Sequence, residues 1–431
     1  MPLISKPASQ DRASQVHPRD WALLGLLAYM PFSTILDSWF PLRILNYSGF
    51  VTVIPTMFAI AIYLVIVIKQ GQKFVYLPFF MAILAAFVVG CRQLLIERSP
   101  SLDGALNAVR YIVLVPVYLV LWRMTIRNQT LADWTRRIIL VGGLMMAVFG
   151  VLHDFGLPTF YAPVSNDVEL TAYDLDPTST RYGGPSGASN GYGNFLVLPL
   201  LALVGTKVKN VKLALPFLLM ILLGITSSGS RLALGMASLL SVLVLFRARR
   251  GWVNGSAMVL VVAGTWFLMV LSAGVRIDVV MERFHEDFGR GEKNAIATDA
   301  LKTSFSNLCF GTRADQLILG EKGEYQFSDN SYLQVACSAG VPASLVFCVC
   351  CLWVMRLRLK HESFSVWLAV AIFAITFYLN NSILWDNWIF WGSAVYWLIK
   401  HEDLQTVRAR RPNKMLIPAT KVLFDQLPTS N

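Results

Sequence analysis

Repeated apolar runs constrain the fold of this chain more than any other feature of its sequence. Phe74–Cys91 and Ser331–Met355, for example, contain no charged residue. A helix needs roughly 20 apolar residues to cross a bilayer, and about 12 runs approach that length. Only 15% of the 431 residues are charged, whereas a soluble domain carries roughly a quarter. We therefore expect an all-α polytopic membrane protein with about 12 transmembrane helices and two long outward-facing loops.

Lys and Arg gather in every second loop, whereas the other loops are mixed or acidic. The basic loops contain, among others, Lys69, Arg136, Lys207, Arg247 and Arg356. Because basic loops of membrane proteins stay in the cytoplasm, we expect both termini to be cytoplasmic. The same bias explains the net charge of +11, and we predict no nucleic-acid partner.

This topology divides the chain into three regions. We expect a cytoplasmic tail over 1–20, an integral membrane domain over 21–400 with outward loops 153–190 and 274–330, and a cytoplasmic tail over 401–431. The expected spans lie near Trp21–Leu36, Gly49–Ile68, Phe74–Cys91, Leu106–Trp122, Ile138–Leu152, Tyr192–Gly205, Val211–Ile225, Ser230–Phe246, Val253–Ala273, Ser331–Met355, Phe364–Leu384 and Trp388–Ile399.

The second outward loop, within Gly274–Gly340, is the longest polar stretch between two spans. Long loops in compact proteins usually carry function. Its arginines are suited to an anionic, lipid-linked substrate; we favour Arg290, which has glycine neighbours, with Arg313 as a further candidate. The loop should also contain an amphipathic helix that lies on the membrane or caps the bundle. The apolar stripe predicted for that helix consists of Ile296, Ala300, Leu301 and Phe305.

Arg231 is the strongest candidate for binding an anion. It follows Thr226-Ser227-Ser228-Gly229-Ser230 at the start of a span. A charge within a span is costly and tends to mark a functional site, and free backbone N–H groups at a helix start favour anions; a guanidinium extended to the interface is the alternative. Arg110 and Arg181 are further substrate-binding candidates. A pair with Asp103 and a solvated loop charge are their respective alternatives.

Asp329 is the best candidate for a proton acceptor. It stands just before a span, beside Asn330 and Tyr332, which we predict to contact substrate. A carboxylate at a partly dry interface can accept a proton from a hydroxyl group. The alternative is that Asp329 caps the following helix. His285 is a second candidate base.

We predict neither a metal ion nor a cofactor. No group of His, Cys and carboxylate residues has zinc spacing, and no Gly-rich phosphate loop precedes a Lys. Asp174-x-Asp176 resembles the carboxylates that hold a divalent ion in many glycosyltransferases, but this spacing arises easily in an acidic loop.

Two groups of apolar residues are assigned structural roles. Cysteines at 348, 350 and 351 are interpreted as apolar packing, and a disulfide between Cys91 and Cys309 is left open. Trp385, Trp388 and Trp391 are predicted to form an interfacial aromatic belt, with sugar stacking as the alternative.

Four stretches occur in a fixed order along the chain. They are Leu106-Asn107-Ala108-Val109-Arg110-Tyr111 with Pro116, Arg181-Tyr182-Gly183-Gly184 leading to Asn190, Ser228-Gly229-Ser230-Arg231, and Asp329-Asn330-Ser331-Tyr332-Leu333 with Gly340 and Pro342. In this order, with a large loop before the fourth stretch, they resemble the O-antigen ligase and O-antigen polymerase superfamily of bacterial envelope proteins. The resemblance covers roughly Arg110 to Leu384.

The resemblance implies a metal-independent glycosyl transfer on the outer face of the bacterial inner membrane. The donor would be a glycan on polyprenyl pyrophosphate, whose charge Arg231 and Arg290 would neutralise. An acceptor hydroxyl would attack the anomeric carbon, and polyprenyl pyrophosphate would leave. Where ligases of the family carry histidine this chain has Asp329, so the resemblance favours a polymerase that joins lipid-linked repeat units. Membrane lipids, a flippase and a chain-length regulator are the other partners that it implies.

Several alternatives remain open from the sequence. A ligase would transfer the glycan to lipid A core instead. A flippase or transporter of lipid-linked glycan would carry charges near the bilayer midplane and broken helices related by a repeat. A glycosyltransferase with a phosphate-monoester lipid donor would need an outer carboxylate near Asp37 or Asp174 and a metal. A purely structural membrane subunit would need neither Arg231 nor Asp329 at the interface.

Overall fold

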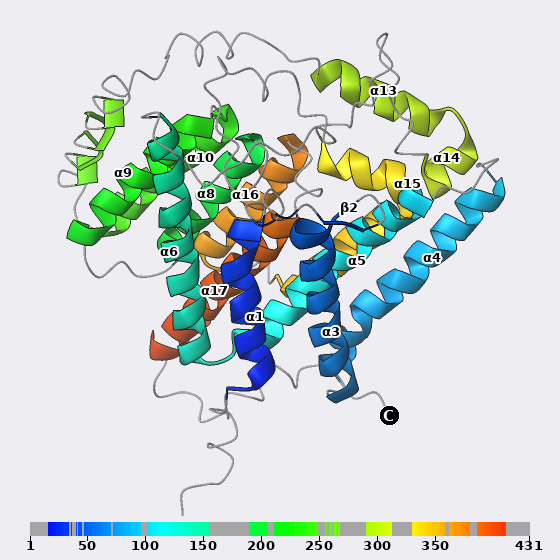
Figure 1. The fold of residues 1–431 in the computed structure, drawn as a ribbon, viewed down its shortest axis with the longest axis horizontal. Helices are drawn as coiled ribbons and strands as arrows, with labels where there is room; N and C mark the ends of the chain where they lie inside the picture. The colour runs from blue at the N-terminus through cyan, green and yellow to red at the C-terminus, as the bar shows by residue number, and fades with distance from the viewer. Residues whose placement is uncertain are drawn as a thin grey trace, which may run out of the picture.

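The described part of the chain is a bundle of α-helices with one short pair of strands (Figure 1). The computed structural model describes residues 16–33, 36, 40, 42–44, 47–69, 72–95, 102–154, 189–205, 211–228, 230–248, 255–267 without 257, 261 and 265, 290–312, 330–357, 362–379 and 386–410. The strands β1 (Arg43–Ile44) and β2 (Tyr47–Ser48) pair antiparallel and were not predicted. A π-helical turn at Gly49–Val53 then leads into the next helix.

Most helices coincide with the expected spans. They are α1 (Pro18–Tyr29), α3 (Ile54–Lys69), α4 (Leu77–Leu95), α5 (Leu102–Thr125), α6 (Gln129–Asp154), α8 (Ser189–Gly205), α9 (Val211–Ser228), α10 (Arg231–Ala248), α13 (Arg290–Lys302), α14 (Phe305–Phe310), α15 (Ser331–Met355), α16 (Phe364–Leu379) and α17 (Asp386–Arg410). Short 3-10 helices stand at Met30–Phe32 and Lys73–Tyr76. The last helix continues about ten residues past the expected span, because α17 ends at Arg410.

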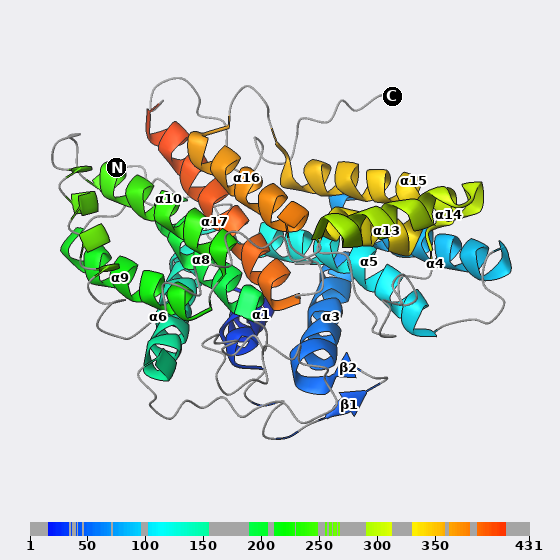
Figure 2. The same cartoon turned by 90° about the horizontal axis from the view of Figure 1, so that it is seen from above.

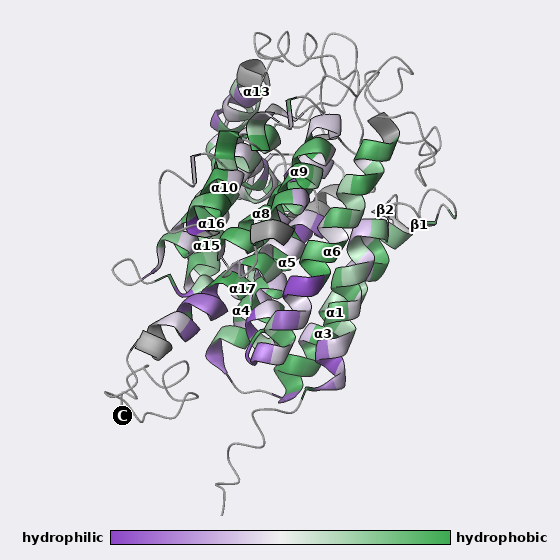
Figure 3. Ribbon diagram, turned by 90° about the vertical axis from the view of Figure 1, so that its left-hand side faces the viewer, coloured by the Kyte–Doolittle hydropathy of each residue, from purple (hydrophilic) through white to green (hydrophobic). Residues whose placement is uncertain are grey.

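Three helices in the described part are long and apolar enough to cross a membrane: Lys73–Leu95, Gln129–Leu152 and Ser331–Met355. Shorter apolar helices stand at Ile54–Lys69, Ile112–Thr125, Gly191–Gly205, Ala214–Ser228, Leu232–Arg247 and Phe364–Leu379. Figure 3 shows hydrophobic residues along these helices and hydrophilic ones toward the C-terminal part of α17. These helices indicate a membrane-embedded protein, although they are fewer than the roughly 12 crossings expected.

Long-range hydrogen bonds define two ends of the bundle. At the upper end, where α13 and α14 lie in Figure 1, Trp388 Nε1 at the start of α17 donates to Asn194 O near the start of α8, 3.2 Å away. At the lower end, Arg247 at the end of α10 donates to Ser365 Oγ at the start of α16, 2.7 Å away. Consecutive helices such as α8, α9 and α10 therefore run in alternating directions between the two ends.

Basic residues that are far apart in the sequence gather at the lower end. Arg136 pairs with Glu402, and Lys400 pairs with Glu362. Arg127 lies in the turn between α5 and α6, where desolvation and the nearby Arg19 lower its pKa to about 10. The guanidinium of Arg127 is nevertheless protonated at neutral pH, because a pKa of 10 is far above 7.

Three donors cap the lower end of α15. The bonds run from Arg123 NH1 to Val354 O at 3.0 Å, from Tyr396 Oη to Met355 O at 2.8 Å, and from Lys400 Nζ to Arg356 O at 3.2 Å. The Arg123 guanidinium also stacks 3.6 Å above the Phe74 ring. The last carbonyl oxygens of a helix have no partner within the helix, and these three side chains supply the missing donors.

The predicted amphipathic stripe of the loop helix is partly wrong. Ala297 and Leu301 form a small buried cluster with Cys337 of α15. Ile296 and Phe305, by contrast, are exposed. Ala297, and not Ile296, is therefore on the side of α13 that packs on α15. It follows that α13 packs on α15 and does not bury the whole predicted stripe.

The predicted aromatic belt is also wrong for two of its three residues. Trp388 and Trp391 are buried in the bundle, and Trp391 Nε1 donates to Leu27 O at 2.8 Å; Trp385 lies outside the described residues. Their indole N–H groups find backbone acceptors on neighbouring helices, which makes burial favourable. All six cysteines are free thiols, so Cys91 and Cys309 form no disulfide.

Candidate functional site

Several predicted site residues fall outside the part of the chain that the structure describes. They are Asp329, Arg181 and Arg313, together with the alternative base His285 and the Asp174-x-Asp176 pair. Most of the loops 153–190 and 274–330 lies outside it as well, apart from helix ends, α13 and α14. The site is therefore built from the residues that flank these segments.

Arg231 is the first residue of α10, as the sequence predicts for an anion-binding helix start. The structure describes its backbone and not its side chain. The turn before it is fixed by buried serines, since Ser230 N donates to Ser228 Oγ at 3.1 Å. Gly193 of α8 lies against this turn so closely that an added Cβ would be 2.6 Å from Ser228 Oγ. The start of α10 is therefore held rigidly against α8.

Asn330 caps the start of α15. Asn330 Oδ1 accepts hydrogen bonds from the backbone nitrogens of Tyr332 and Leu333, at 3.0 and 3.2 Å. This is the geometry of an N-cap. Asn330 therefore has the capping role that was the alternative explanation for Asp329.

Tyr332 joins the start of α15 to α16. Its hydroxyl donates to Ala374 O at 3.4 Å, and its ring lies 5.9 Å from that of Phe377. On α16, the neighbouring Thr376 Oγ1 contacts Met236 Sδ of α10 at 3.7 Å. The end of α16 is thus flanked by the start of α15 and by the helix that Arg231 begins.

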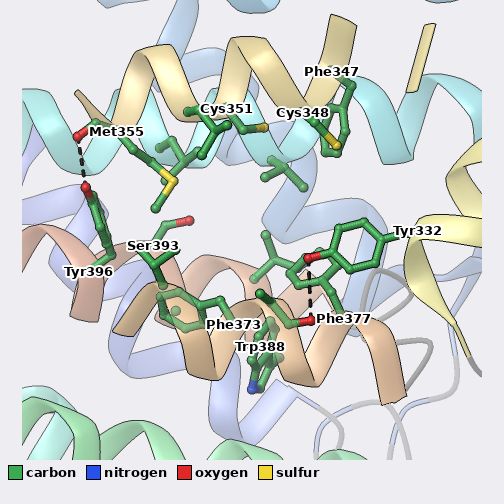
Figure 4. A pocket seen from close by; sticks show the side chains of 17 residues that line it. Tyr332, Phe347, Cys348, Cys351, Met355, Phe373, Phe377, Trp388, Ser393 and Tyr396 are labelled. Carbon is green, nitrogen blue, oxygen red and sulfur yellow. Dashed lines mark hydrogen bonds between the residues drawn. The ribbon is translucent and has the colours of Figure 1, made fainter. Parts of the chain in front are cut away.

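An apolar cavity of about 270 Å³ extends downward from Tyr332 between four helices (Figure 4). Tyr332 and Phe377 lie at one end of it, and Met355 and Tyr396 lie at the other. It is lined by α5, α15, α16 and α17, and on α17 it spans Trp388 to Tyr396. Eight residues of helix correspond to about 12 Å. Such a space accepts an apolar chain and offers few polar partners.

Arg110 precedes the first cavity residue of α5, Val115, by five residues, or about 8 Å along the helix. It is half-buried, and α5 runs from the upper to the lower end. Arg110 therefore lies on the upper side of the cavity. Its location suits contact with a polar group at the cavity mouth.

Arg290 is the first residue of α13. The structure describes its backbone but not its side chain. α13 contacts α15 and α14 at the upper end, as Figures 1 and 2 show. The helices that carry Arg110, Asn330, Tyr332 and Arg290 are in contact, because α15 packs on α5 and on α13. The helix α10, which Arg231 begins, contacts α16, and α16 in turn contacts α15.

Two buried amides at this end were not predicted. The side chains of Asn194 on α8 and Gln334 on α15 are both about 1% exposed. Among the described residues, neither Asn194 side-chain atom has a hydrogen-bond partner, nor does Gln334 Nε2. Buried amides are normally paired, so an unpaired one suggests a ligand or function. Each lies within an expected span, and an amide inside an apolar run is the one sequence feature that could have indicated it.

The described residues contain no group of three or more His, Cys, Asp or Glu side chains that could hold a metal ion. Comparison of the chain with models of protein families, with curated proteins and with solved structures found no match. What the site can do must therefore be judged from its geometry. An apolar cavity beneath elements that carry arginines suits a lipid with an anionic head.

Proposed function

We propose that this protein is a polysaccharide polymerase of the bacterial inner membrane. It transfers a glycan from polyprenyl pyrophosphate to the terminal sugar of another lipid-linked repeat unit. The observation that carries the proposal is the apolar cavity that ends at Tyr332, below the elements that bear Arg231, Arg110 and Arg290. A long apolar chain and a polyanionic head in one substrate would use both features.

The binding energy would come mainly from the apolar chain. Burial of apolar surface contributes about 0.8 kcal/mol per methylene group. The arginines would then neutralise the pyrophosphate, for which the planar guanidinium is better suited than an ammonium group. This division anchors the head at the cavity mouth, where reaction has to occur.

The reaction needs one proton acceptor and one stabilised leaving group. In the proposal, the Asp329 carboxylate takes the proton from the acceptor hydroxyl. At the same time, the oxygen of that hydroxyl bonds to the anomeric carbon of the donor. The bond from that carbon to the pyrophosphate oxygen breaks, and polyprenyl pyrophosphate leaves as an anion. Arg231, with Arg290, stabilises the charge that develops on the leaving group.

The same proposal includes a topology of about 12 membrane crossings. The upper end would face the periplasm, and both termini would be cytoplasmic. Support comes from the gathering of Arg127, Arg136 and Lys400 at the lower end, because basic residues favour the cytoplasmic side.

The position of charges supports surface chemistry over transport. Arg92, Arg123 and Arg247 each lie in the last turn of their helices. A transporter of lipid-linked glycan would instead be expected to carry charges near the middle of its helices. A polymerase that works at the membrane surface needs no charged group near the middle of the bundle.

The test is a reaction of purified protein in nanodiscs with a lipid-linked repeat unit. We expect wild type to release polyprenyl pyrophosphate and to form a ladder of longer lipid-linked glycans. Asp329→Asn and Arg231→Gln should each lose this activity, whereas Val349→Ala, a change at an exposed position of α15, should keep it.

Two outcomes would contradict the proposal. The first is transfer to lipid A core without any ladder, which would identify a ligase. The second is movement of the lipid-linked unit across liposome membranes without glycan transfer, which would identify a flippase. In the second case Asp329→Asn would leave the movement unchanged.

A further inference from the structure

The helix α15 is broken at its upper third, which its apolar sequence conceals. Gly340 has φ 79° and ψ 160°, outside the helical region. Pro342 follows two residues later and has no backbone N–H. The helix therefore loses hydrogen bonds here, in a part of the bundle where unpaired backbone carbonyls are costly.

The carbonyls freed by this break are taken by other elements. Pro342 removes the helical donor of Ser338 O, four residues earlier, and Arg92 NH1 of α4 donates to that oxygen at 2.8 Å. The irregular backbone at Gly340 separates Cys337 O from its helical partner, and Thr312 N donates to it at 2.6 Å. Two separate segments thus hold the break from outside the helix.

Two glycines permit this close contact of backbones. Gly311, at the end of α14, has φ 84°, and an added Cβ there would lie 2.9 Å from the backbone nitrogens of Ala339 and Gly340. An added Cβ at Gly340 would overlap the carbonyl of Cys309. Only glycine combines a positive φ with this approach at both positions.

The break also fixes the helices of the large loop. Asn307 Nδ2 of α14 donates to Ala300 O of α13 at 3.1 Å. Ala297 and Leu301 of α13 pack on Cys337, one residue before Ser338. Arg92, the break of α15, α14 and α13 are therefore linked by a continuous set of contacts. Figure 1 shows α13, α14 and the ends of α15 and α4 side by side in this region.

We infer that Arg92 is a positioning residue for the proposed transfer. By holding the break of α15 from the α4 side, it sets the location of α13 and α14 above the start of α15. A residue with a backbone N–H at position 342 could donate to Ser338 O in an unbroken helix. That donor would cost less free energy than Arg92, because Arg92 is a fully buried charged side chain. The break is therefore best explained by the arrangement that it imposes on Arg290 relative to Asn330 and Tyr332.

The first readout is amide hydrogen exchange of residues 290–312 in nanodiscs, which does not depend on activity. We expect Arg92→Met to raise exchange in this segment at least tenfold while leaving α8 and α17 unchanged. Arg92→Lys, which retains a charged donor, should remain close to wild type. Arg136→Met makes the same substitution as the first variant, at the lower end, and should not change exchange in 290–312.

The second readout is kinetic and rests on the proposed function. Arg92→Met should lower kcat at least tenfold while KM for the lipid-linked donor changes less than threefold, because the cavity that binds the chain is not altered. Gly311→Ala, which pushes α14 from the break without touching Arg92, should have the same effect. If Arg92→Met fails to fold, Gly311→Ala decides the question.

A double variant separates positioning from stability. Pro342→Ala supplies a new N–H donor to Ser338 O, but only if α15 straightens at Gly340. Arg92→Met with Pro342→Ala should therefore regain thermal stability without regaining kcat or slow exchange in 290–312.

Full recovery of kcat in the double variant would overturn the inference, as would unchanged exchange of residues 290–312 in a folded Arg92→Met. If wild type makes no polymer, the proposed function fails. The exchange result still decides whether Arg92 positions α13 and α14.

Discussion

At the scale of single residues, neighbouring side chains at the start of α15 have separate tasks. Asn330 caps the helix through Oδ1. Asp329 lies outside the described residues, and its role as a base stays a proposal. The sequence placed Asn330 at a helix start correctly, but Asp and Asn are equally good N-caps, so composition could not show which residue caps α15.

The two residues should respond in opposite ways to substitution. Asp329→Asn should lower kcat by about 10² to 10⁴, the usual contribution of a general base, with an unchanged melting temperature. Asn330→Ala should lower stability by about 1 kcal/mol through loss of the cap, whereas Asn330→Asp should keep it. Thermal unfolding in nanodiscs and initial rates measure both effects. A stable Asn330→Ala together with an unstable Asp329→Asn would reverse the assignment.

The buried amide of Asn194 gives a second prediction for a single residue. An unpaired buried polar group costs about 1–3 kcal/mol, and leucine shares the branching of asparagine at Cγ but carries no polar atom. Asn194→Leu should therefore raise the melting temperature. If Asn194 contacts the substrate, the same variant should also lose transfer activity.

Asn194→Leu thus distinguishes a functional amide from a merely tolerated one. A more stable and fully active variant would exclude Asn194 from the site. A less stable variant would show that the amide has partners beyond the described residues.

At the scale of elements, α15 is the helix around which its neighbours are arranged. Its bounds, Ser331–Met355, coincide with the predicted span. Its break at Gly340 could not be predicted, because Gly and Pro are common in transmembrane helices. The decisive contacts come from Arg92 and Thr312, which are distant in sequence. Periodicity and composition carry no information about such contacts.

The lower end of α15 gives a prediction about stability alone. Tyr396→Phe removes the hydroxyl that donates to Met355 O at 2.8 Å. The loss of one such bond should lower stability by about 1 kcal/mol. The Tyr396 ring lines the cavity and is retained in this variant, so KM for the donor should change much less than in a variant that fills the cavity. A comparison of melting temperature with initial rate checks this, and a large rise in KM at unchanged stability would mean that the Tyr396 hydroxyl itself contacts the substrate.

The cavity offers a matched pair of substitutions. Val370 lines the cavity, whereas Val349 on α15 is 65% exposed. Val370→Phe should displace about two methylene-sized groups of the apolar chain, at a cost of about 1.6 kcal/mol, or roughly 15-fold in KM. Val349→Phe should leave KM unchanged. Equal effects of the two variants, or an effect independent of chain length in the donor, would contradict a chain-binding cavity.

At the scale of the whole molecule, the sequence was most informative about which segments are helical. Apolar runs predicted nearly every described helix, and the sites of Arg231 and Asn330 at helix starts followed from them. Which helices pack against each other could not be predicted from the sequence. The pairing of Trp388 and Trp391 with α8 and α1 turned an expected surface belt into part of the core. Burial of this kind depends on which helices are neighbours.

The arrangement of the whole bundle separates two chemical environments. One end collects basic groups paired with Glu362 and Glu402. At the other end, α16 contacts both Tyr332 at the start of α15 and Met236 of α10, beside an apolar cavity. A lipid-linked anion would bind with its chain between the helices and its head at the upper end.

The most direct measurement is photolabelling with a polyprenyl-pyrophosphate donor that carries a diazirine group in its apolar chain. The account predicts labelled peptides from the cavity segments 347–355, 370–377 and 388–396, with less label in Val370→Phe and unchanged label in Val349→Phe. Label confined to the exposed faces of α3 and α4, with none in the cavity, would contradict it.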